Sequence, residues 1–282
     1  MGTRHCRRPC ARPDRDPQGS PASSQGVAVR RPQRACGTDP QGGLNVYFSL
    51  ITPRPGFERR AAHEWLGGAY GEHQWLWRFF PAPAGTERDF LFRRRDAEGL
   101  PRFYVVSQRK PQLDSDAWQI QCREYRPQVP SGARLSFELR ANPVVSRKGE
   151  KGAKRHDVVM DAKKRLLAAR DLPNWEAWKP DLTTADGQPD PPPPLYELVH
   201  IACTEWLASR AEQYGFALDE STVSVAAYEQ HGGKHGQLRF STVDLAGELI
   251  VTDTERFASA LASGIGRAKA FGCGLLLVRP AT

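Results

Sequence analysis

Tyr70 and His73 are the two residues of this 282-residue chain whose types and spacing best suit proton transfer. They lie three positions apart, so a helix over 70–80 would place both side chains on one face. An imidazole with a pKa of about 6.5 accepts and donates protons near neutral pH. RNA is cleaved without a metal when its own 2′-hydroxyl attacks the adjacent phosphorus, provided that side chains move the two protons involved. The pair has the groups for this reaction.

A packing role for His73 competes with the catalytic one. Aromatic residues surround it in the sequence at Trp75, Trp77, Phe79 and Phe80. A histidine in such a setting is often partly buried and hydrogen-bonded. Spacing alone therefore favours the packed histidine.

Other histidines and cysteines do not form a metal site by their spacing. His231 and His235 are separated by Gly232-Gly233-Lys234, and glycines so close together do not favour the helix that an i, i+4 zinc site needs. Cys6 and Cys10 stand near His5, but no second ligand pair follows at finger-like spacing. We expect neither a metal nor a cofactor.

Two cationic segments favour a phosphate backbone as the ligand. The first, over 146–156, is predicted to be a loop with five cationic side chains opposed only by Glu150: Arg147, Lys148, Lys151, Lys154 and Arg155. The second, over 264–274, combines cations with glycines that allow close backbone approach: Arg267 and Lys269 with Gly264, Gly266, Gly272 and Gly274. It lacks the Gly-Lys-Ser/Thr of a P-loop. A tight helix-to-strand connection explains its glycines equally well.

Charge and composition indicate a disordered N-terminal extension and a cytoplasmic location. The net charge is +8, and residues 1–44 supply +5 of it from eight Arg and three Asp. This Arg/Pro/Gly-rich stretch lacks aromatic residues and is predicted to be a disordered extension. Bacterial genes can begin at a GUG codon that is read as Met. The natural protein could then begin near Val46, and residues 1–44 would come from sequence upstream of its start codon. Six scattered cysteines and the lack of an apolar run of about 18 to 20 residues favour a reducing, cytoplasmic location without membrane contact.

The remaining chain reads as an α+β protein of two tandem ferredoxin-like (RRM-like) domains, over 45–130 and 131–282. In the first, strands are predicted at 46–51, 89–94, 102–108 and 118–125, and helices at 57–66 and 70–80. In the second, strands are predicted at 135–140, 157–160, 223–228, 237–243, 246–252 and 274–279, and helices at 161–170, 195–214 and 254–265. The Pro-rich stretch 189–194 is predicted to be a non-helical insertion. A helix between 102 and 118 has poor sequence support. Sheets of this type commonly bind RNA.

Four segments together resemble the CasE family, the CRISPR-repeat endoribonucleases of type I-E Cascade complexes. They are Val46-Tyr47-Phe48-Ser49, the stretch from Tyr70 to Pro81 followed by Arg88-Asp89-Phe90-Leu91-Phe92, the run from Phe137 to Pro143, and 264–276. Their order and spacing cover the chain from residue 46 to its end. Residues 1–44 and the Pro-rich stretch depart from the family pattern.

The resemblance implies a function. A member of this family binds the stem-loop of each repeat in pre-crRNA and cleaves at the 3′ base of the stem without metal. The products carry a 5′-hydroxyl and a 2′,3′-cyclic phosphate, and the protein stays bound to the crRNA among the other Cascade subunits. The family's catalytic residues fall on His73 and Tyr70. Its RNA-binding basic residues fall on Arg140 and the cations of 146–156, and the glycine-rich segment matches a hallmark of the family. The alternative is a non-catalytic RNA-binding subunit of a ribonucleoprotein particle.

Overall fold

A computed structural model describes residues 45–65, 69–149, 152–232 and 239–281. All of them belong to one compact unit. The predicted disordered tail, Lys151 and His235 lie outside the described residues. Among those that are described, no helix is both long and apolar enough to cross a membrane. The division into domains at 45–130 and 131–282 stays a prediction.

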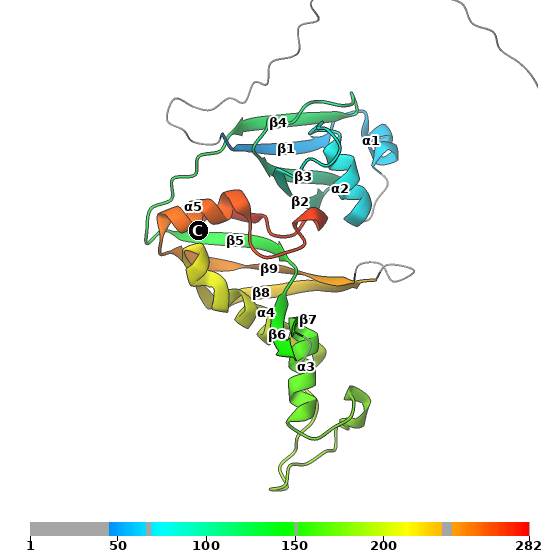
Figure 1. Cartoon of the computed structure of the whole chain (residues 1–282), viewed down its shortest axis with the longest axis vertical. Helices are drawn as coiled ribbons and strands as arrows, with labels where there is room; N and C mark the ends of the chain where they lie inside the picture. Colours follow the sequence, from blue (N-terminus) through cyan, green and yellow to red (C-terminus); the bar gives the residue numbers. More distant parts are fainter. Residues whose placement is uncertain (1–44, 66–68, 150–151, 233–238, 282) are drawn as a thin grey trace, which may run out of the picture. The chain divides into compact units, whose positions relative to one another are not determined.

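The first half of the structure is a four-stranded antiparallel sheet with two helices beside it (Figure 1). Its strands lie in the order β2-β3-β1-β4, which is the ferredoxin-like order. The elements are β1 (Tyr47–Pro53), α1 (Glu58–Glu64), α2 (Ala69–Trp77), β2 (Phe90–Ala97), β3 (Leu100–Ser107) and β4 (Trp118–Glu124).

Two local features of this half differ from a full β-α-β-β-α-β unit and from the predicted bounds. Residues 108–117 form no helix between β3 and β4, as their weak sequence support suggested. Helix α2 ends at Trp77, where 70–80 was predicted, because residues 78–80 form tighter turns with bonds such as Phe80 N–H to Trp77 O at 2.9 Å. Pro81 follows, and the residue before a proline disfavours the helical region.

The second half repeats the same strand order with both helices present. Its antiparallel sheet runs β10-β5-β9-β8. Figure 1 shows β5, β9 and β8 of this sheet side by side. The elements are β5 (Arg134–Ala141), α4 (Leu195–Ala211), η2 (Glu212–Tyr214), β8 (Phe216–His231), β9 (Phe240–Val251), α5 (Thr254–Ser263), η4 (Lys269–Phe271) and β10 (Leu276–Pro280). The strands predicted at 237–243 and 246–252 are one continuous strand, β9, since Gly247 pairs in register with Phe137 of β5. The prediction of tandem ferredoxin-like folds is confirmed.

An insertion between β5 and α4 carries the basic segment. It comprises the hairpin of β6 (Val144–Gly149) and β7 (Gly152–Asp157), then α3 (Val158–Ala168) and η1 (Trp175–Ala177). The basic segment is therefore a two-stranded hairpin and not a loop. The predicted strand over 157–160 is wrong, because the Asp157 side chain accepts a hydrogen bond from Met160 N–H at 2.9 Å and caps α3.

Separate apolar clusters hold the two halves. In the first, α2 and the turn after it pack on one face of the sheet, α2 through Trp75 and Leu76 and the turn through Phe79. The opposite face of that sheet joins the second half at Leu91, Val106 and Leu275. These contacts place the segment before β10 against β2.

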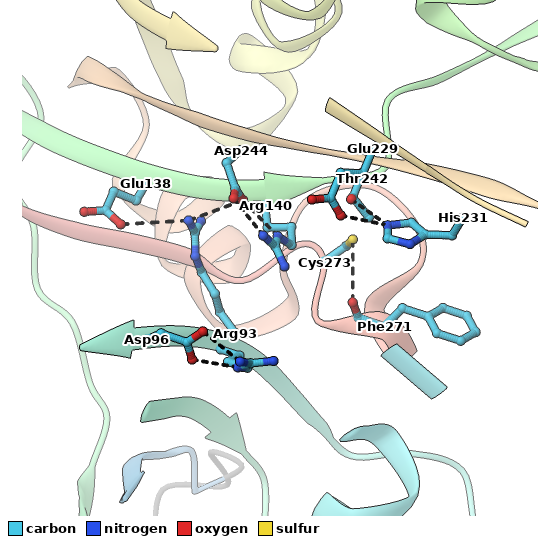
Figure 2. Close-up of polar contacts among 11 residues, drawn as sticks. Arg93, Asp96, Glu138, Arg140, Glu229, His231, Thr242, Asp244, Phe271 and Cys273 are labelled. Carbon is cyan, nitrogen blue, oxygen red and sulfur yellow. Dashed lines mark hydrogen bonds and ion pairs between the residues drawn. The ribbon is translucent and has the colours of Figure 1, made fainter. Parts of the chain in front are cut away.

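Ion pairs supplement that apolar contact. Figure 2 shows Arg93 of β2 directed at two carboxylates of the second sheet, those of Asp244 and Glu138. The Arg93 Nη2 atom lies 3.5 Å from Asp244 Oδ1 and 3.9 Å from Glu138 Oε2. Arg95 pairs with Glu138 at 3.0 Å. Strand β2 of the first sheet is thus held to the second sheet by ion pairs.

Candidate active site

His73 lies on α2 with its ring between aromatic side chains. The Trp77 Nε1–H donates to His73 Nε2 at 3.3 Å, so the neutral ring carries its proton on Nδ1. The Phe90 ring stacks on the imidazole, with 6.5 Å between centroids and 29° between planes. The side chain is half-buried. Burial lowers the pKa of His73, and the nearby charge of Arg88 lowers it further.

The sequence of α2 fixes the direction of His73. Trp75 and Leu76 are buried in the core on one side of the helix. On the same face, at i, i+3 and i+4 spacing from them, the buried carboxylate of Glu72 accepts a hydrogen bond from Arg94 Nη1 of β2 at 3.0 Å. Burial raises the pKa of Glu72, while Arg94 opposes that rise. The helix is therefore tied to the sheet by both apolar and ionic contacts.

Tyr70 lies in the first turn of the same helix, as the sequence predicted. Its backbone is described and its side chain is not. The i, i+3 spacing with His73 is retained in α2.

Arg88 stands just before β2, beside the same ring that stacks on His73. Its guanidinium carbon lies 5.9 Å from the Phe90 ring centroid. The Nε and Nη1 atoms are inaccessible to solvent, and no described residue accepts a hydrogen bond from them. Burial lowers the pKa of Arg88. Buried donors without acceptors typically cost about 1–3 kcal/mol, so this arrangement has to serve some other purpose.

The glycine-rich segment brings a second cation to this region. Between α5 and β10 the chain makes a compact excursion, closed by Ile265 N–H to Gly274 O at 2.8 Å, and η4 within it packs against α2 and β2. Lys269 of η4 donates to Ser263 O at 2.6 Å. Burial and then the charge of Arg88 lower the pKa of Lys269. Arg267 of the same segment is exposed.

The four glycines of this segment are needed for its path. All have positive φ: Gly264, Gly266, Gly272 and Gly274. A Cβ at Gly264 would lie 2.8 Å from both Gly274 O and Leu91 Cδ1. The glycines therefore permit close packing of this segment, and the helix-to-strand connection considered from the sequence is what they build.

The predicted RNA-binding cations fall into two groups. Two are bound by carboxylates: Arg140 bonds Asp244 at 2.8 and 2.9 Å (Figure 2), and Arg147 bonds Asp161 of α3. The others on the hairpin, Lys148, Lys154 and Arg155, are exposed and pair with no described carboxylate.

Histidines and cysteines elsewhere do not add a metal centre. In the described part of the chain, no group of three or more His, Cys, Asp or Glu could hold a metal ion. His231 instead bonds Thr242 Oγ1 at 2.8 Å and stacks on Phe240. Cys273 is buried, and burial raises the pKa of its thiol to about 12.

The structure thus brings together His73, Lys269 and a residue that the sequence did not single out, Arg88. Arg88 belongs to one of the segments that carry the family resemblance, but it had no predicted role. Its neighbour Asp89 would have suggested a local ion pair, whereas Asp89 pairs with Arg109. Only the fold shows that Arg88 lies near His73 and that no carboxylate in the described ranges pairs with it.

Comparisons with known proteins agree with this fold. The profile of a family described as CRISPR associated protein matches residues 46–280. The CRISPR system Cascade subunit CasE of Escherichia coli (strain K12) is 28% identical over 223 residues, which is 78% of this chain and 96% of that protein. Among solved structures, CRISPR endoribonuclease Cse3 bound to a 19-nt RNA aligns with a TM-score of 0.57 and 24% identity, over 84% of this chain and 100% of the other. Thermus thermophilus Cse3, bound to an RNA representing a pre-cleavage complex, gives 0.56 at the same identity and coverage.

Proposed function

This chain belongs to the CRISPR-associated protein family, and on that premise we propose that it is an endoribonuclease that processes CRISPR RNA. It binds the stem-loop of each repeat in pre-crRNA and cuts at the 3′ base of the stem. The Escherichia coli protein CasE is 28% identical to this chain over most of both sequences. Cse3 structures that contain RNA share the ferredoxin-like fold of both halves.

The observation that carries the proposal is the position of His73. Its half-buried imidazole lies near Arg88, a cation that no described carboxylate neutralises, and Lys269 in turn lies near Arg88. A purely structural histidine has no need of a desolvated cation nearby, since the charge makes its protonation harder. A site that receives a phosphate diester has that need.

The reaction follows from these groups. The 2′-hydroxyl of the nucleotide before the cut attacks the adjacent phosphorus, its proton passes to a base, and the 5′-oxygen leaves with a proton from an acid. The products carry a 2′,3′-cyclic phosphate and a 5′-hydroxyl. His73, neutral at pH 7 in the free protein, removes the 2′ proton through Nε2 when the hydroxyl takes the place of the Trp77 N–H there. Tyr70, one turn away, orients or assists that hydroxyl. No step requires a metal ion.

RNA binding away from the cut is assigned to the exposed cations. Lys148, Lys154 and Arg155 of the β6–β7 hairpin, with Arg267 of the glycine-rich segment, contact phosphates of the repeat. Arg140 and Arg147 position the hairpin and the sheet through their carboxylate partners. After cleavage the protein keeps the stem-loop and takes its place among the other Cascade subunits.

A repeat-containing transcript incubated with the protein in EDTA tests this function. We expect two fragments, with a 2′,3′-cyclic phosphate on the upstream one and a 5′-hydroxyl on the downstream one. Cleavage that EDTA abolishes would point to a metal mechanism. Tight binding of the stem-loop without any cleavage would favour the alternative of a non-catalytic RNA-binding subunit.

A further inference from the structure

We propose that Arg88, together with Lys269, binds the non-bridging oxygens of the phosphate that is cut. This inference rests on the proposed function and adds to it the residue that holds the reacting group. Arg88 carries no such role from the sequence, and the geometry points to it through three features: its missing partner, the pocket it lines and its place beside His73.

Arg88 differs from the other arginines around it. The three consecutive arginines of β2 all pair with carboxylates: Arg93 with Asp244, Arg94 with Glu72 and Asp96, and Arg95 with Glu138. Arg109 pairs with Asp89, at 3.0 Å between Nη2 and Oδ1.

Arg93 and Arg88 share one feature, since Nε and Nη1 of both are buried without a described acceptor. They differ in that Arg93 has carboxylates at Nη2, whereas no described carboxylate forms an ion pair with Arg88. A partly buried guanidinium of this kind is best explained by an anionic partner that is not part of the protein.

A pocket of about 360 Å³ opens next to this guanidinium. Arg88 and Lys269 both line it, with Phe90 and Ser107 on one side and Ser263 on the other. The Ser263 carbonyl accepts a hydrogen bond from Lys269 Nζ and so fixes the ammonium at the pocket. The two halves of the protein therefore each contribute one cation to the same space.

His73 is not among the residues that line this pocket, but it stacks on Phe90, which does line it. Its ring and the guanidinium of Arg88 both contact Phe90, at 6.5 and 5.9 Å from the Phe90 centroid. Because the positive charge of Arg88 disfavours imidazolium, a phosphate between them offsets that effect. A phosphate held by Arg88 thus lies where the imidazole can exchange protons with its 2′- and 5′-oxygens.

The chemistry of the step explains why an arginine is suited here. As the 2′-oxygen bonds to phosphorus and before the 5′-oxygen leaves, a second negative charge develops on the non-bridging oxygens. A guanidinium offers parallel N–H donors that match two oxygens at once, and Lys269 adds a point charge. Donors already desolvated in the free protein stabilise that charge more than they stabilise the substrate.

The test is single-turnover cleavage of a repeat hairpin by the full chain carrying Arg88→Gln. We expect a loss of about 10²-fold or more in rate and partial recovery in Arg88→Lys. Affinity for a hairpin with 2′-deoxyribose at the cut should stay within about threefold, since one phosphate contact among many is lost. The control Arg59→Gln removes the same charge from an exposed position of α1 and should cleave at the wild-type rate.

Two further measurements separate the alternatives. Arg88→Gln should melt no lower than wild type, because the replaced donors have no described partner; a clear drop in melting temperature would make Arg88 structural and overturn the inference. Inorganic phosphate should perturb the His73 ring resonances in wild type and not in Arg88→Gln.

The failure of this inference and the failure of the proposed function look different. If His73→Ala is inactive while Arg88→Gln cleaves within about threefold of wild type, the function stands and the inference is wrong. If His73→Ala cleaves normally, the proposed function is wrong, and the phosphate response of the His73 resonances still decides whether Arg88 holds an anion.

Discussion

The indole N–H of Trp77 donates to Nε2 of His73 from one helical turn away, at 3.3 Å. The ring nitrogen that would accept a proton is thus already engaged by a donor in the free protein. Burial and the charge of Arg88 lower the pKa of His73, and a donor on Nε2 favours the neutral ring. His73 is thus held in one tautomer and one orientation by its own helix.

Replacing His73 with alanine should abolish cleavage and leave stem-loop binding nearly unchanged. Proton transfer by a placed histidine is worth on the order of 10² to 10⁴ in rate, and the imidazole is not one of the phosphate-binding cations. Single-turnover cleavage and a gel-shift titration measure the two effects. His63→Ala, on the exposed side of α1, is the matched control and should behave as wild type. Undiminished cleavage by His73→Ala would remove the assignment.

Cleavage should depend on pH through the neutral form of His73. Because the pKa of His73 is lowered, the fraction of neutral imidazole is lost only below about pH 6.5, and the acid limb of kcat/KM should lie there. Trp77→Phe removes a donor that favours the neutral ring, so it should move this limb upward in pH. A rate that instead falls as pH rises through 6 to 7 would show that His73 acts as an acid.

The same lowered pKa predicts how stability depends on pH. Since the folded protein binds a proton at His73 less readily than the unfolded chain does, the contribution of His73 is fully present above about pH 6.5. It is lost as the pH falls through the two pKa values. Urea unfolding at pH 7 and pH 5 measures this, and the difference should shrink in His73→Ala.

Tyr70→Phe should lower the cleavage rate without lowering affinity, since it removes only a hydroxyl from the face of α2 that bears His73. A loss of about tenfold or more is expected if the phenol assists the 2′-hydroxyl. Tyr196→Phe makes the same change at a position of α4 that is 77% exposed, and it should have no effect. Equal rates for the two variants would exclude Tyr70 from the chemistry.

The hairpin cations should divide into binding and structural residues. Lys154→Ala and Arg155→Ala should weaken stem-loop binding and reduce the salt slope by about one each, with unchanged melting temperature. Arg147→Ala should instead lower the melting temperature, because it leaves the Asp161 carboxylate of α3 without its bidentate partner. Titrations at several salt concentrations and thermal melts separate the two effects. A salt slope unchanged in the first two variants would contradict the binding role of the hairpin.

Gly264→Ala should be strongly destabilising. Its φ of 76° and ψ of 163° lie in a region open essentially to glycine alone, and a Cβ would meet Gly274 O and Leu91 at 2.8 Å. We expect a loss of about 3 kcal/mol or more. Gly85→Ala, with a φ of 83° and open space around it, should cost only about 1 kcal/mol. Urea titrations give both values, and equal losses would mean that packing at Gly264 contributes nothing.

Much of the fold was predictable because its strands and helices alternate in a regular way. The order of elements, the lack of a helix over 108–117 before β4 and the spacing of Tyr70 and His73 all follow from local pattern. Predicted boundaries were wrong where the local sequence was compatible with two kinds of secondary structure. Asp157 caps a helix that was predicted to begin later, at residue 161, and Gly149 pairs with Gly152 at the end of a two-stranded hairpin where a loop was expected.

The site was less predictable than the fold, because it depends on which cationic side chains lack a carboxylate partner in the folded protein. Arg140 and Arg147 look like free cations in the sequence and are bound to Asp244 and Asp161, which are distant or on another element. Arg88 looks like half of a local pair with Asp89 and is not. Such distinctions arise only when distant segments pack, so a list of basic residues does not separate them.

The glycine-rich segment has a consequence for the order of events during synthesis. His73 and Arg88 leave the ribosome early, while Lys269 and β10 emerge after every other described element, and β10 must still pair with β5. Proteins fold largely from the N-terminus as they are made. A nascent chain therefore carries its imidazole for most of its translation without the second cation beside it, and we expect nuclease activity to appear only once the chain is complete and released.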